Sequence, residues 1–342
     1  MKDSINIAIA GATGYIGLEL IKILSKHPKA KILYLCATKS IGKSIFSFEK
    51  KINKKKLPTI SKIEKIDWSK IDVIFTALPN GEAHKIANSL PANVKLIDLS
   101  ADFRLSDPKI YKKWYGKNHK SIKSIPKSIY SISEFTKKEL KKYNIISCPG
   151  CYPTSIQLPL IPLIKKNLIK VDNIIIDSKS GFSGAGKKIK EKFKFKYLFT
   201  SVRAYGVGSH RHMAEIDQEL TKVSKKKINV SFTPHLIPMF RGILSTIYLE
   251  TKNNKKAINI YNFLKKYHKD NFFVKISKFN KPIGTGDVMN TNYCHISVCK
   301  NRKKNKIIII SAIDNLVKGG SGQAIQNMNL SFNFDEALGL KW

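Results

Sequence analysis

The stretch "INIAIAGATGYIGLELIKIL" (5–24) decides the fold expected for the N-terminal half of the chain. It begins with nearly continuous apolar residues that end at a glycine, which is typical of a buried strand, and it continues with apolar residues at helical spacing. A second apolar run, "KILYLCA" (31–37), follows the predicted helix. A strand, a glycine-rich turn, a helix and a further strand in this order predict a βαβ unit, and therefore a parallel sheet.

Two further strands are predicted at "DVIFTALP" (72–79) and "VKLIDLS" (94–100), with a helix at "EAHKIANSL" (82–90) between them. Later in the chain the predicted strands are separated by long insertions, and one clear helix is predicted at 256–270. We therefore expect an α/β protein with two domains. The first is a Rossmann-type doubly wound parallel sheet over 1–149, and the second is an α+β domain with a mixed sheet over 150–316.

The composition of the 342 residues, with 42% hydrophobic and 10% aromatic residues, is that of a globular chain with substantial cores. Lys and Arg number 62 against 24 acidic residues, a balance that would suit nucleic-acid binding. The excess is mostly Lys, however, and it is spread through the chain together with Ile and Asn, which indicates a codon bias. The run "KNRKKNK" (300–306) is predicted to be a solvated loop. We expect no nucleic-acid partner.

The chain has five cysteines, a small and odd number that does not suit a disulfide framework. This count favours a reducing compartment. The apolar strand pattern begins at Ile5 and leaves no space for a targeting segment. No apolar run reaches the ~18 residues that a membrane-spanning helix needs. We expect a cytoplasmic protein that does not associate with membranes.

The glycine motif "GATGYIG" (11–17) stands between the first predicted strand and helix. Glycines there let the backbone approach a pyrophosphate, and the helix start offers it free N–H groups, although a tight turn without a ligand is the alternative. The segment after the second strand, "CATKSIGK" (36–43), has no acidic residue for a ribose 2′-hydroxyl, and its hydroxyls and cations favour the 2′-phosphate of NADP. The predicted cofactor-binding residues of this region are Gly11, Thr13, Gly14, Tyr15, Ile16, Gly17, Thr38, Lys39 and Ser40.

The stretch "IISCPGCYPTS" (145–155) holds two cysteines three residues apart. It can be a redox pair, half of a zinc site, a pair of core thiols, or one nucleophile with a bystander. A redox pair usually follows the first strand of a smaller fold, and the remaining cysteines do not complete a metal site, so we expect no metal. Pro153 suits the first turn of a helix, where a thiol is activated. The sequence therefore predicts Cys151 as the nucleophile and Cys148 as the bystander.

A nucleophilic thiol needs a proton donor or base, and "GVGSHRHMAEIDQEL" (206–220) offers the best candidates. His210 and His212 come just before a predicted helix, and Glu215 lies one helical turn after His212, where its carboxylate can orient that imidazole or serve the substrate site. Exposed histidines and a metal site are the alternatives. We favour His210 for direct contact with the substrate and His212 as its neighbour.

Three arginines stand out because Arg is scarce in a Lys-rich chain. Arg104, Arg211 and Arg241 are predicted to bind anionic groups of a substrate, since a guanidinium binds carboxylate or phosphate through two hydrogen bonds. Structural salt bridges are the alternative. Gly184 is predicted to approach the cofactor, and Asn315, at a strand end, to bind the nicotinamide amide, unless they form a plain loop and a helix cap.

These motifs together carry a family resemblance over essentially the whole chain. They are, in order, "GATGYIG", "ALPNGEAH", "LIDLSADFRL", "PGCYPTS", "SGFSGAGKK", "HRHMAEI", "HLIPMFRGIL" and "DNLVKGGSGQAIQNMN". The chain resembles the N-acetyl-γ-glutamyl-phosphate reductases, NADPH-dependent enzymes of arginine biosynthesis in the aspartate-semialdehyde dehydrogenase-like superfamily. It departs from their usual pattern at Ala214, where Pro is more common, and at Gly320 and Ser321, where small apolar residues are more common.

The resemblance implies a complete reaction for the candidate residues. The Cys151 thiolate attacks an acyl phosphate and expels phosphate, NADPH reduces the thioester, and an imidazole exchanges the proton. It also implies that the C-terminal segment 317–342 joins the Rossmann domain 1–149, and that 150–316 is a catalytic and dimerisation domain. The same resemblance implies a homodimer or homotetramer. Two other functions remain open: a sister reductase for aspartyl or N-substituted aminoadipyl phosphate, and a basic nucleotide-binding regulator, against which the cysteine, histidine and arginine residues argue.

Overall fold

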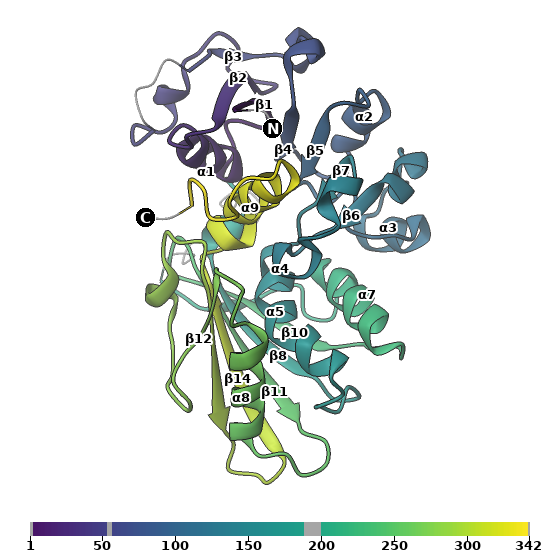
Figure 1. The fold of residues 1–342 in the computed structure, drawn as a ribbon, viewed down its shortest axis with the longest axis vertical. Helices are drawn as coiled ribbons and strands as arrows, with labels where there is room; N and C mark the ends of the chain where they lie inside the picture. Colours follow the sequence, from purple (N-terminus) through teal and green to yellow (C-terminus); the bar gives the residue numbers. More distant parts are fainter. Residues whose placement is uncertain (1–2, 53–56, 188–199, 341–342) are drawn as a thin grey trace. The chain divides into compact units, whose positions relative to one another are not determined.

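The computed structural model describes residues 3–52, 57–187 and 200–340 of the chain. These residues form two compact units (Figure 1). Residues 1–149 and 320–342 make up unit 1, and residues 150–319 make up unit 2. The C-terminal segment of the chain therefore returns to the unit that contains the N-terminus.

Unit 1 is built on a seven-stranded sheet in which every paired strand is parallel. Its strand order is β3-β2-β1-β4-β5-β7-β6. The strands are β1 (Ile5–Ala10), β2 (Ala30–Cys36), β3 (Ile60–Ser61), β4 (Val73–Thr76), β5 (Lys95–Asp98), β6 (Ser128–Tyr130) and β7 (Ile145–Ser147). The chain moves outward from β1 in one direction and then restarts on its other side at β4, so the predicted doubly wound sheet is confirmed.

Short helices connect these strands, and the last long helix of the chain also belongs to unit 1. The helices are α1 (Tyr15–Leu24), α2 (Ala83–Asn88), α3 (Pro108–Tyr115), α4 (Ser133–Thr136) and α9 (Gly322–Ser331). Single 3₁₀ turns lie at Ile45–Ser47, Ile63–Lys65, Trp68–Lys70, Ile122–Lys127 and Leu140–Lys142. Buried hydrogen bonds hold α9 in place: the side-chain oxygen of Asn327 accepts from the hydroxyls of Ser131 at 2.8 Å and Ser133 at 2.6 Å.

Unit 2 contains a seven-stranded mixed sheet in the order β12-β13-β14-β11-β8-β10-β9. Its strands are β8 (Ile175–Gly181), β9 (Arg203–Ala204), β10 (Ser231–Ile237), β11 (Ile243–Glu250), β12 (Val274–Ile276), β13 (Cys294–Lys300) and β14 (Lys306–Ile313). Its helices are α5 (Cys151–Lys165), α7 (His212–Ser224) and α8 (Ala257–Tyr267), with 3₁₀ turns at Phe182–Ala185 and Thr285–Val288. A π-helical turn, Val317–Ser321, follows β14. The mixed sheet is the one expected from the sequence.

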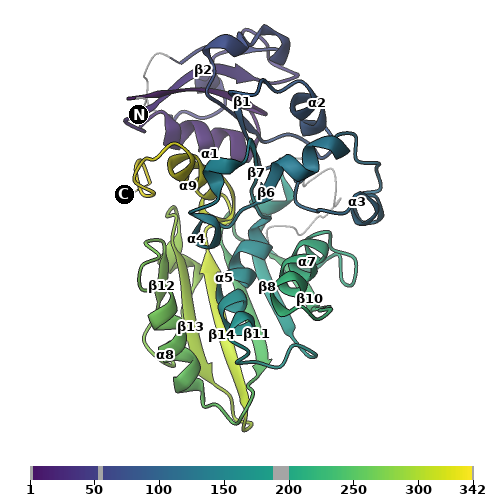
Figure 2. The ribbon, with the colours of Figure 1, turned by 45° about the vertical axis from the view of Figure 1, so that its right-hand side comes forward.

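Helix α5 lies on one face of the mixed sheet, with α7 and α8 beside it (Figure 2). Side chains of the strands alternate in burial: Ser245 of β11 is buried and hydrogen-bonded to Ser155 of α5, whereas Tyr248 is exposed on the opposite face. No helix among the described residues covers that opposite face. The core of unit 2 therefore lies between α5 and the sheet, and the described helices leave the other face of the sheet, called the open face below, uncovered.

Candidate active site

Cys151 is the first residue of α5, where the positive end of the helix dipole favours a negative charge. Its side chain is partly exposed and forms no disulfide. Cys148, three residues earlier, is fully buried, and burial raises the pKa of its thiol to about 12. Cys148 therefore stays protonated at neutral pH, whereas the position of Cys151 is that of a reactive thiol.

The first turn of α7 packs against the backbone that precedes Cys151. Glu215 is fully buried, and its Oε2 accepts the backbone N–H of Gly150 at 2.9 Å. Its Oε1 lies 3.9 Å from His212 Nε2, which is an electrostatic rather than a hydrogen-bonding distance. A Cβ added to Gly150 would lie 2.5 Å from the same Nε2. Only glycine therefore lets the His212 imidazole reach this backbone, and the structure brings His212, Glu215 and Cys151 together.

His210 is also part of this cluster and is more accessible than His212. Its Nδ1 accepts the backbone N–H of His212 at 3.2 Å, so the neutral imidazole carries its proton on Nε2. The ring makes edge contacts with the rings of His212 at 4.7 Å, Tyr205 at 5.4 Å and Tyr152 at 5.6 Å between centroids. The predicted pair of histidines thus forms one aromatic cluster beside Cys151.

Two tyrosines that were not predicted as site residues complete the cluster. The hydroxyl of Tyr205 donates to that of Tyr152 at 3.2 Å. Burial raises the pKa of both phenols, so both remain neutral near pH 7. Tyr152 could have been noticed as the neighbour of Cys151, but Tyr205 is 53 residues further along the chain and has no local pattern that points to the thiol.

A second glycine packs against Cys151. A Cβ added to Gly319, in the π-helical turn, would lie 2.7 Å from Cys151 Cβ. The backbone N–H of Gly319 donates to the carbonyl oxygen of Asp314 at 2.9 Å. Gly319 is also absent from the predicted site, because only the three-dimensional fold brings it to the cysteine.

Arg241 supports the turn that carries Gly319. Its Nη1 donates to the buried carboxylate of Asp314 at 3.1 Å and to Asn290 Oδ1 at 2.7 Å. The other oxygen of Asp314 accepts the backbone N–H groups of Leu316 and Val317 at 2.9 and 3.2 Å. Arg241 therefore forms an internal salt bridge. A structural salt bridge was the alternative to substrate binding for each of the three predicted arginines.

Asn315 and Gly184 are neighbours within unit 2. Asn315 is buried; its Oδ1 accepts the N–H of Gly242 at 2.7 Å, and its Nδ2 donates to Ser183 Oγ at 2.9 Å. A Cβ added to Gly184 would lie 3.6 Å from Asn315 Nδ2. Asn315 therefore joins the start of β11 to the 3₁₀ turn that contains Gly184.

The two remaining predicted arginines differ in their surroundings. Arg211 is exposed and directly precedes α7, between the two histidines. Arg104 belongs to unit 1 and is buried; its Nε donates to the carbonyl oxygen of Cys148 at 2.8 Å and its Nη2 to that of Leu99 at 3.1 Å. In this structure Arg104 thus holds the ends of two neighbouring strands, whereas Arg211 faces solvent.

The predicted dinucleotide loop of unit 1 fits a pyrophosphate. Gly11 has φ +87°, and a Cβ there would overlap the carbonyl oxygen of Ala77. Helix α1 begins at Tyr15 with Gly14 as its N-cap, and no side chain among the described residues caps it. Its first-turn N–H groups have no partner within the helix, so an anion is well placed there. The other members of the loop are Thr13 and Ile16, both partly exposed, and Gly17, which is buried.

The segment after β2 lies at the same edge of the sheet, because Ala10 at the end of β1 pairs with Cys36 at the end of β2. Thr38 and Lys39 are exposed, and Ser40 is partly exposed with φ +68°. This segment offers hydroxyl groups and an ammonium group but no carboxylate. It therefore suits the 2′-phosphate of NADP better than the ribose 2′-hydroxyl of NAD. These residues fit NADP.

The described residues were not found to form either a metal site or a membrane span. No group of three or more His, Cys, Asp or Glu side chains there can hold a metal ion. None of the described helices is long and apolar enough to cross a membrane.

Comparison with known proteins relates both units to one superfamily. Residues 6–143 match the NAD-binding domain of the semialdehyde dehydrogenases, and residues 151–315 match their dimerisation domain. The fold is that of the aspartate semialdehyde dehydrogenase II of Vibrio cholerae, with a TM-score of 0.73 and 18% identity over 96% of this chain and 99% of that one. A Candida albicans aspartate semialdehyde dehydrogenase, solved with NADP, gives a TM-score of 0.66 at 16% identity over 96% of this chain and 98% of that one.

Closer relatives share a single name. The chain is 43% identical over 339 residues to a probable N-acetyl-gamma-glutamyl-phosphate reductase, chloroplastic, of Arabidopsis thaliana, covering 99% of this chain and 84% of that protein. It is 42% identical over 342 residues to the N-acetyl-gamma-glutamyl-phosphate reductase of Ehrlichia canis, covering 99% and 98%. These matches confirm the resemblance found in the sequence: the chain belongs to the N-acetyl-γ-glutamyl-phosphate reductase family of the semialdehyde dehydrogenases.

Proposed function

We propose that the chain catalyses the NADPH-dependent reduction of N-acetyl-γ-glutamyl phosphate to N-acetylglutamate 5-semialdehyde and phosphate, a step of arginine biosynthesis. The observation that carries this proposal is the placement of Cys151 at the start of α5, with His212 and Glu215 packed against the preceding backbone. The shared name of relatives that match nearly the whole chain supports the choice of substrate. We also infer a cytoplasmic setting, because none of the five cysteines forms a disulfide.

NADP, when bound, supplies or accepts the hydride. The proposed roles of unit 1 are to hold the pyrophosphate on the N–H groups of the first turn of α1, which begins at Tyr15, and to hold the 2′-phosphate on Thr38, Lys39 and Ser40. Gly184 and Asn315 of unit 2 remain candidates for contact with the nicotinamide end of the cofactor.

Cys151 is the proposed nucleophile. Its sulfur forms a bond to the acyl carbon while the bond from that carbon to phosphate breaks, which releases phosphate and leaves a thioester. Reduction of the thioester gives a thiohemiacetal, and the C–S bond then breaks to release the semialdehyde and the thiol. Sulfur suits both steps, because it is a strong nucleophile and a good leaving group. The N–H groups at the start of α5 are placed to stabilise the developing oxyanion.

His210 is the proposed proton carrier. It is the more accessible of the two histidines, and the hydrogen bond that its Nδ1 accepts from the backbone N–H of His212 leaves Nε2–H of the neutral ring to donate a hydrogen bond to an oxyanion. Transfer of the proton itself requires the imidazolium form, in which Nδ1 is also protonated and releases the His212 N–H. His212 positions His210 through this hydrogen bond. Glu215, buried 3.9 Å from His212 Nε2, favours positive charge on the pair of imidazoles.

The three predicted arginines have different proposed roles. Arg211 is exposed between the histidines, so we assign to it the direct binding of a substrate carboxylate or phosphate. Arg241 is proposed to act through Asp314 on the turn that contains Gly319. Arg104 is proposed to hold the carbonyl oxygen of Cys148, close in sequence to the nucleophile.

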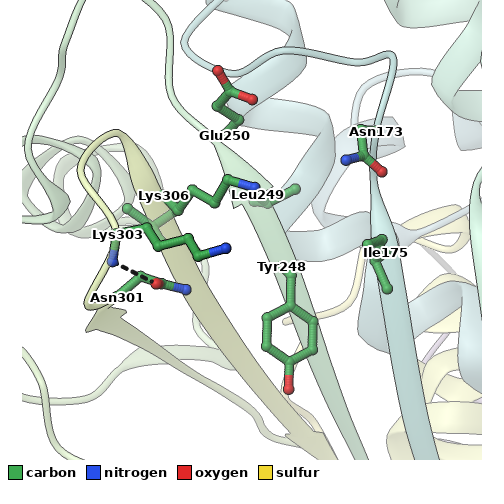
Figure 3. Close-up of a pocket in the computed structure, with 9 residues that line it drawn as sticks. Asn173, Ile175, Tyr248, Leu249, Glu250, Asn301, Lys303 and Lys306 are labelled. Atoms are coloured by element: carbon green, nitrogen blue, oxygen red, sulfur yellow. Dashed lines mark hydrogen bonds between the residues drawn. The ribbon is translucent and has the colours of Figure 1, made fainter.

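The open face of the mixed sheet is the proposed dimer interface. Ile175 of β8 and Tyr248 of β11 pair across the strands and are 42% and 41% exposed, at the rim of a cavity of about 240 Å³ (Figure 3). Leu244, Ile308 and Ile310 are partly exposed on the same face. A second copy of this chain is the proposed occupant, because residues 151–315 match a dimerisation domain. A homotetramer would require a further contact.

The deciding experiment is the reverse reaction: reduction of NADP by N-acetylglutamate 5-semialdehyde in the presence of phosphate. We expect phosphate-dependent activity in the native protein, a loss of at least about 10³-fold in Cys151→Ser, and near-normal activity in the matched control Cys148→Ser, whose buried thiol has no proposed role. Activity that survives in Cys151→Ser would exclude the thioester route. Aspartate semialdehyde, assayed alongside, would be the better substrate if the protein were the sister reductase.

A further inference from the structure

We propose that a basic cavity in unit 2, remote from Cys151, binds a small polyanion that carries two or more phosphate groups. The cavity measures about 800 Å³ and lies between the start of α8 and the turn that joins β13 to β14. A cavity of this size accommodates a small organic molecule.

The cavity is separated from the candidate active site by the length of β14. Ile313, the last residue of β14, lies next to Gly319 and hence near Cys151. Lys306, the first residue of the same strand, lines the cavity. At about 3.4 Å per residue, seven steps along the strand correspond to ~24 Å. The two sites therefore bind different molecules.

The lining of the cavity is strongly basic. Six of its twelve residues are lysines and none is acidic, whereas only 62 of the 342 residues in the chain are Lys or Arg. Lysine is frequent in other loops of this chain as well, but here six lysines line a single cavity. The six residues are Lys255, Lys256, Lys300, Lys303, Lys304 and Lys306.

An acidic residue beside this cluster, Glu250, is already paired with a lysine. Glu250 lines the smaller neighbouring cavity of Figure 3 and pairs with Lys170 at 2.5 Å. The pKa of Glu250 is lowered first by Lys170 and more weakly by Lys306. The remaining positive charges repel one another, and an anion with several negative charges would relieve that repulsion.

Hydrogen bonds fix the loops that carry these lysines. Thr251, which is buried, donates its backbone N–H to the carbonyl oxygen of Asn305 and its hydroxyl to that of Lys255, both at 2.8 Å. The backbone N–H of Lys303 donates to Asn301 Oδ1 at 2.9 Å (Figure 3). The two lysine-bearing loops are therefore held together before any ligand binds, which lowers the entropic cost of binding.

One wall of the cavity is apolar. Phe279 and Ile258 both line it, and Ile258 is 37% exposed. Lys300 Nζ lies 5.8 Å from the centre of the Phe279 ring, and the backbone N–H of Lys300 donates to Asn280 Oδ1 at 3.0 Å. A nucleotide would use both the apolar wall and the ammonium groups, whereas an inorganic polyphosphate would use only the ammonium groups.

The test is a calorimetric titration of the full chain with inorganic tripolyphosphate and, separately, with ATP. The cavity variant is Lys256→Glu combined with Lys304→Glu; both positions are exposed, and neither lines the smaller cavity. The matched control, Lys112→Glu combined with Lys113→Glu, makes the same charge change on exposed positions of α3. Dehydrogenase activity and light scattering verify that both variants are folded and equally assembled.

We expect the cavity variant to bind tripolyphosphate at least about tenfold more weakly than the native protein, the control variant to bind as the native protein does, and added salt to weaken binding. Tighter binding of ATP than of tripolyphosphate would identify a nucleotide as the ligand; equal binding would identify an inorganic polyphosphate. Affinity retained in the cavity variant, or lost equally in both variants, would overturn the proposal.

Discussion

Single residues decide the geometry around Cys151, and two of them are glycines. Gly150 leaves the space that the His212 imidazole fills, and Gly319 leaves the space beside Cys151 Cβ. Their role is to be small at contacts between segments that are distant in the chain. A contact of this kind is more sensitive to one added methyl group than to many changes on the surface.

We expect Gly150→Ala to reduce kcat by about 10²-fold or more, because the added Cβ would lie 2.5 Å from His212 Nε2 and displace the imidazole. Gly286→Ala is the control: a Cβ there meets nothing within 4 Å. Steady-state kinetics and thermal unfolding of both variants test this. Normal kcat in Gly150→Ala would show that the position of His212 does not matter for the reaction.

Glu215→Gln tests the charge beside the histidines. Gln retains a side-chain oxygen for the N–H of Gly150, but it removes the negative charge that lies 3.9 Å from His212 Nε2. We expect kcat to fall about 10-fold to 100-fold, because the buried negative charge that complements a positively charged imidazole is lost. Glu219→Gln, one turn later on α7, should leave kcat unchanged. A native kcat in Glu215→Gln, measured by steady-state kinetics, would exclude the electrostatic role.

The sequence predicts an active-site residue only where the residues that it contacts or depends on are close to it in the chain. Cys151 was predicted from its place before Pro153, and His212 with Glu215 from a spacing of one helical turn. Gly319 and Tyr205 were not predicted, because their contacts with the Cys151 region arise from the packing of segments that are far apart in sequence.

At the scale of elements, a chain of three hydroxyl groups joins α5 to the mixed sheet. Ser155 donates its hydroxyl to the carbonyl oxygen of Tyr152 at 2.9 Å. The contact of 2.7 Å with Ser245 must then be donated by Ser245, and that of 2.8 Å between Ser245 and Ser178 by Ser178. All three side chains are fully buried, so the direction of every hydrogen bond is determined.

Ser245→Ala should lower the free energy of unfolding by about 1–3 kcal/mol, because it leaves the buried hydroxyl of Ser178 without its acceptor and that of Ser155 without its donor. Ser231→Ala, at an exposed position of β10, should change it by less than about 0.5 kcal/mol. Urea denaturation of both variants provides the comparison. A Ser245→Ala variant as stable as the native protein would show that water or a shift in packing replaces the lost hydrogen bonds.

The long strands and amphipathic helices could be predicted from their own residues, as β1, α1 and α8 were. The two-residue β3 and the three-residue β6 could not, because each exists only through pairing with a neighbouring strand. Helix α5 contains Pro159 and Pro162, and burial of nearly all its side chains against the sheet outweighs their low helix propensity. Tertiary packing, not local preference, determines these elements.

Assembly of the protein is proposed to depend on the open face of the mixed sheet. We expect Tyr248→Lys to convert an oligomer into monomers, because it places an ammonium group among the apolar side chains of Ile175 and Ile308 on the proposed dimer interface. Ile122→Lys is the control: Ile122 is 56% exposed in unit 1, so this change adds the same charge away from the sheet. Light scattering during size-exclusion chromatography gives the mass of each variant, and far-UV circular dichroism verifies folding.

A folded Tyr248→Lys variant with the native mass would place the interface elsewhere. A lower mass of the assembly in both variants would indicate that added charge alone, rather than this face of the sheet, controls assembly.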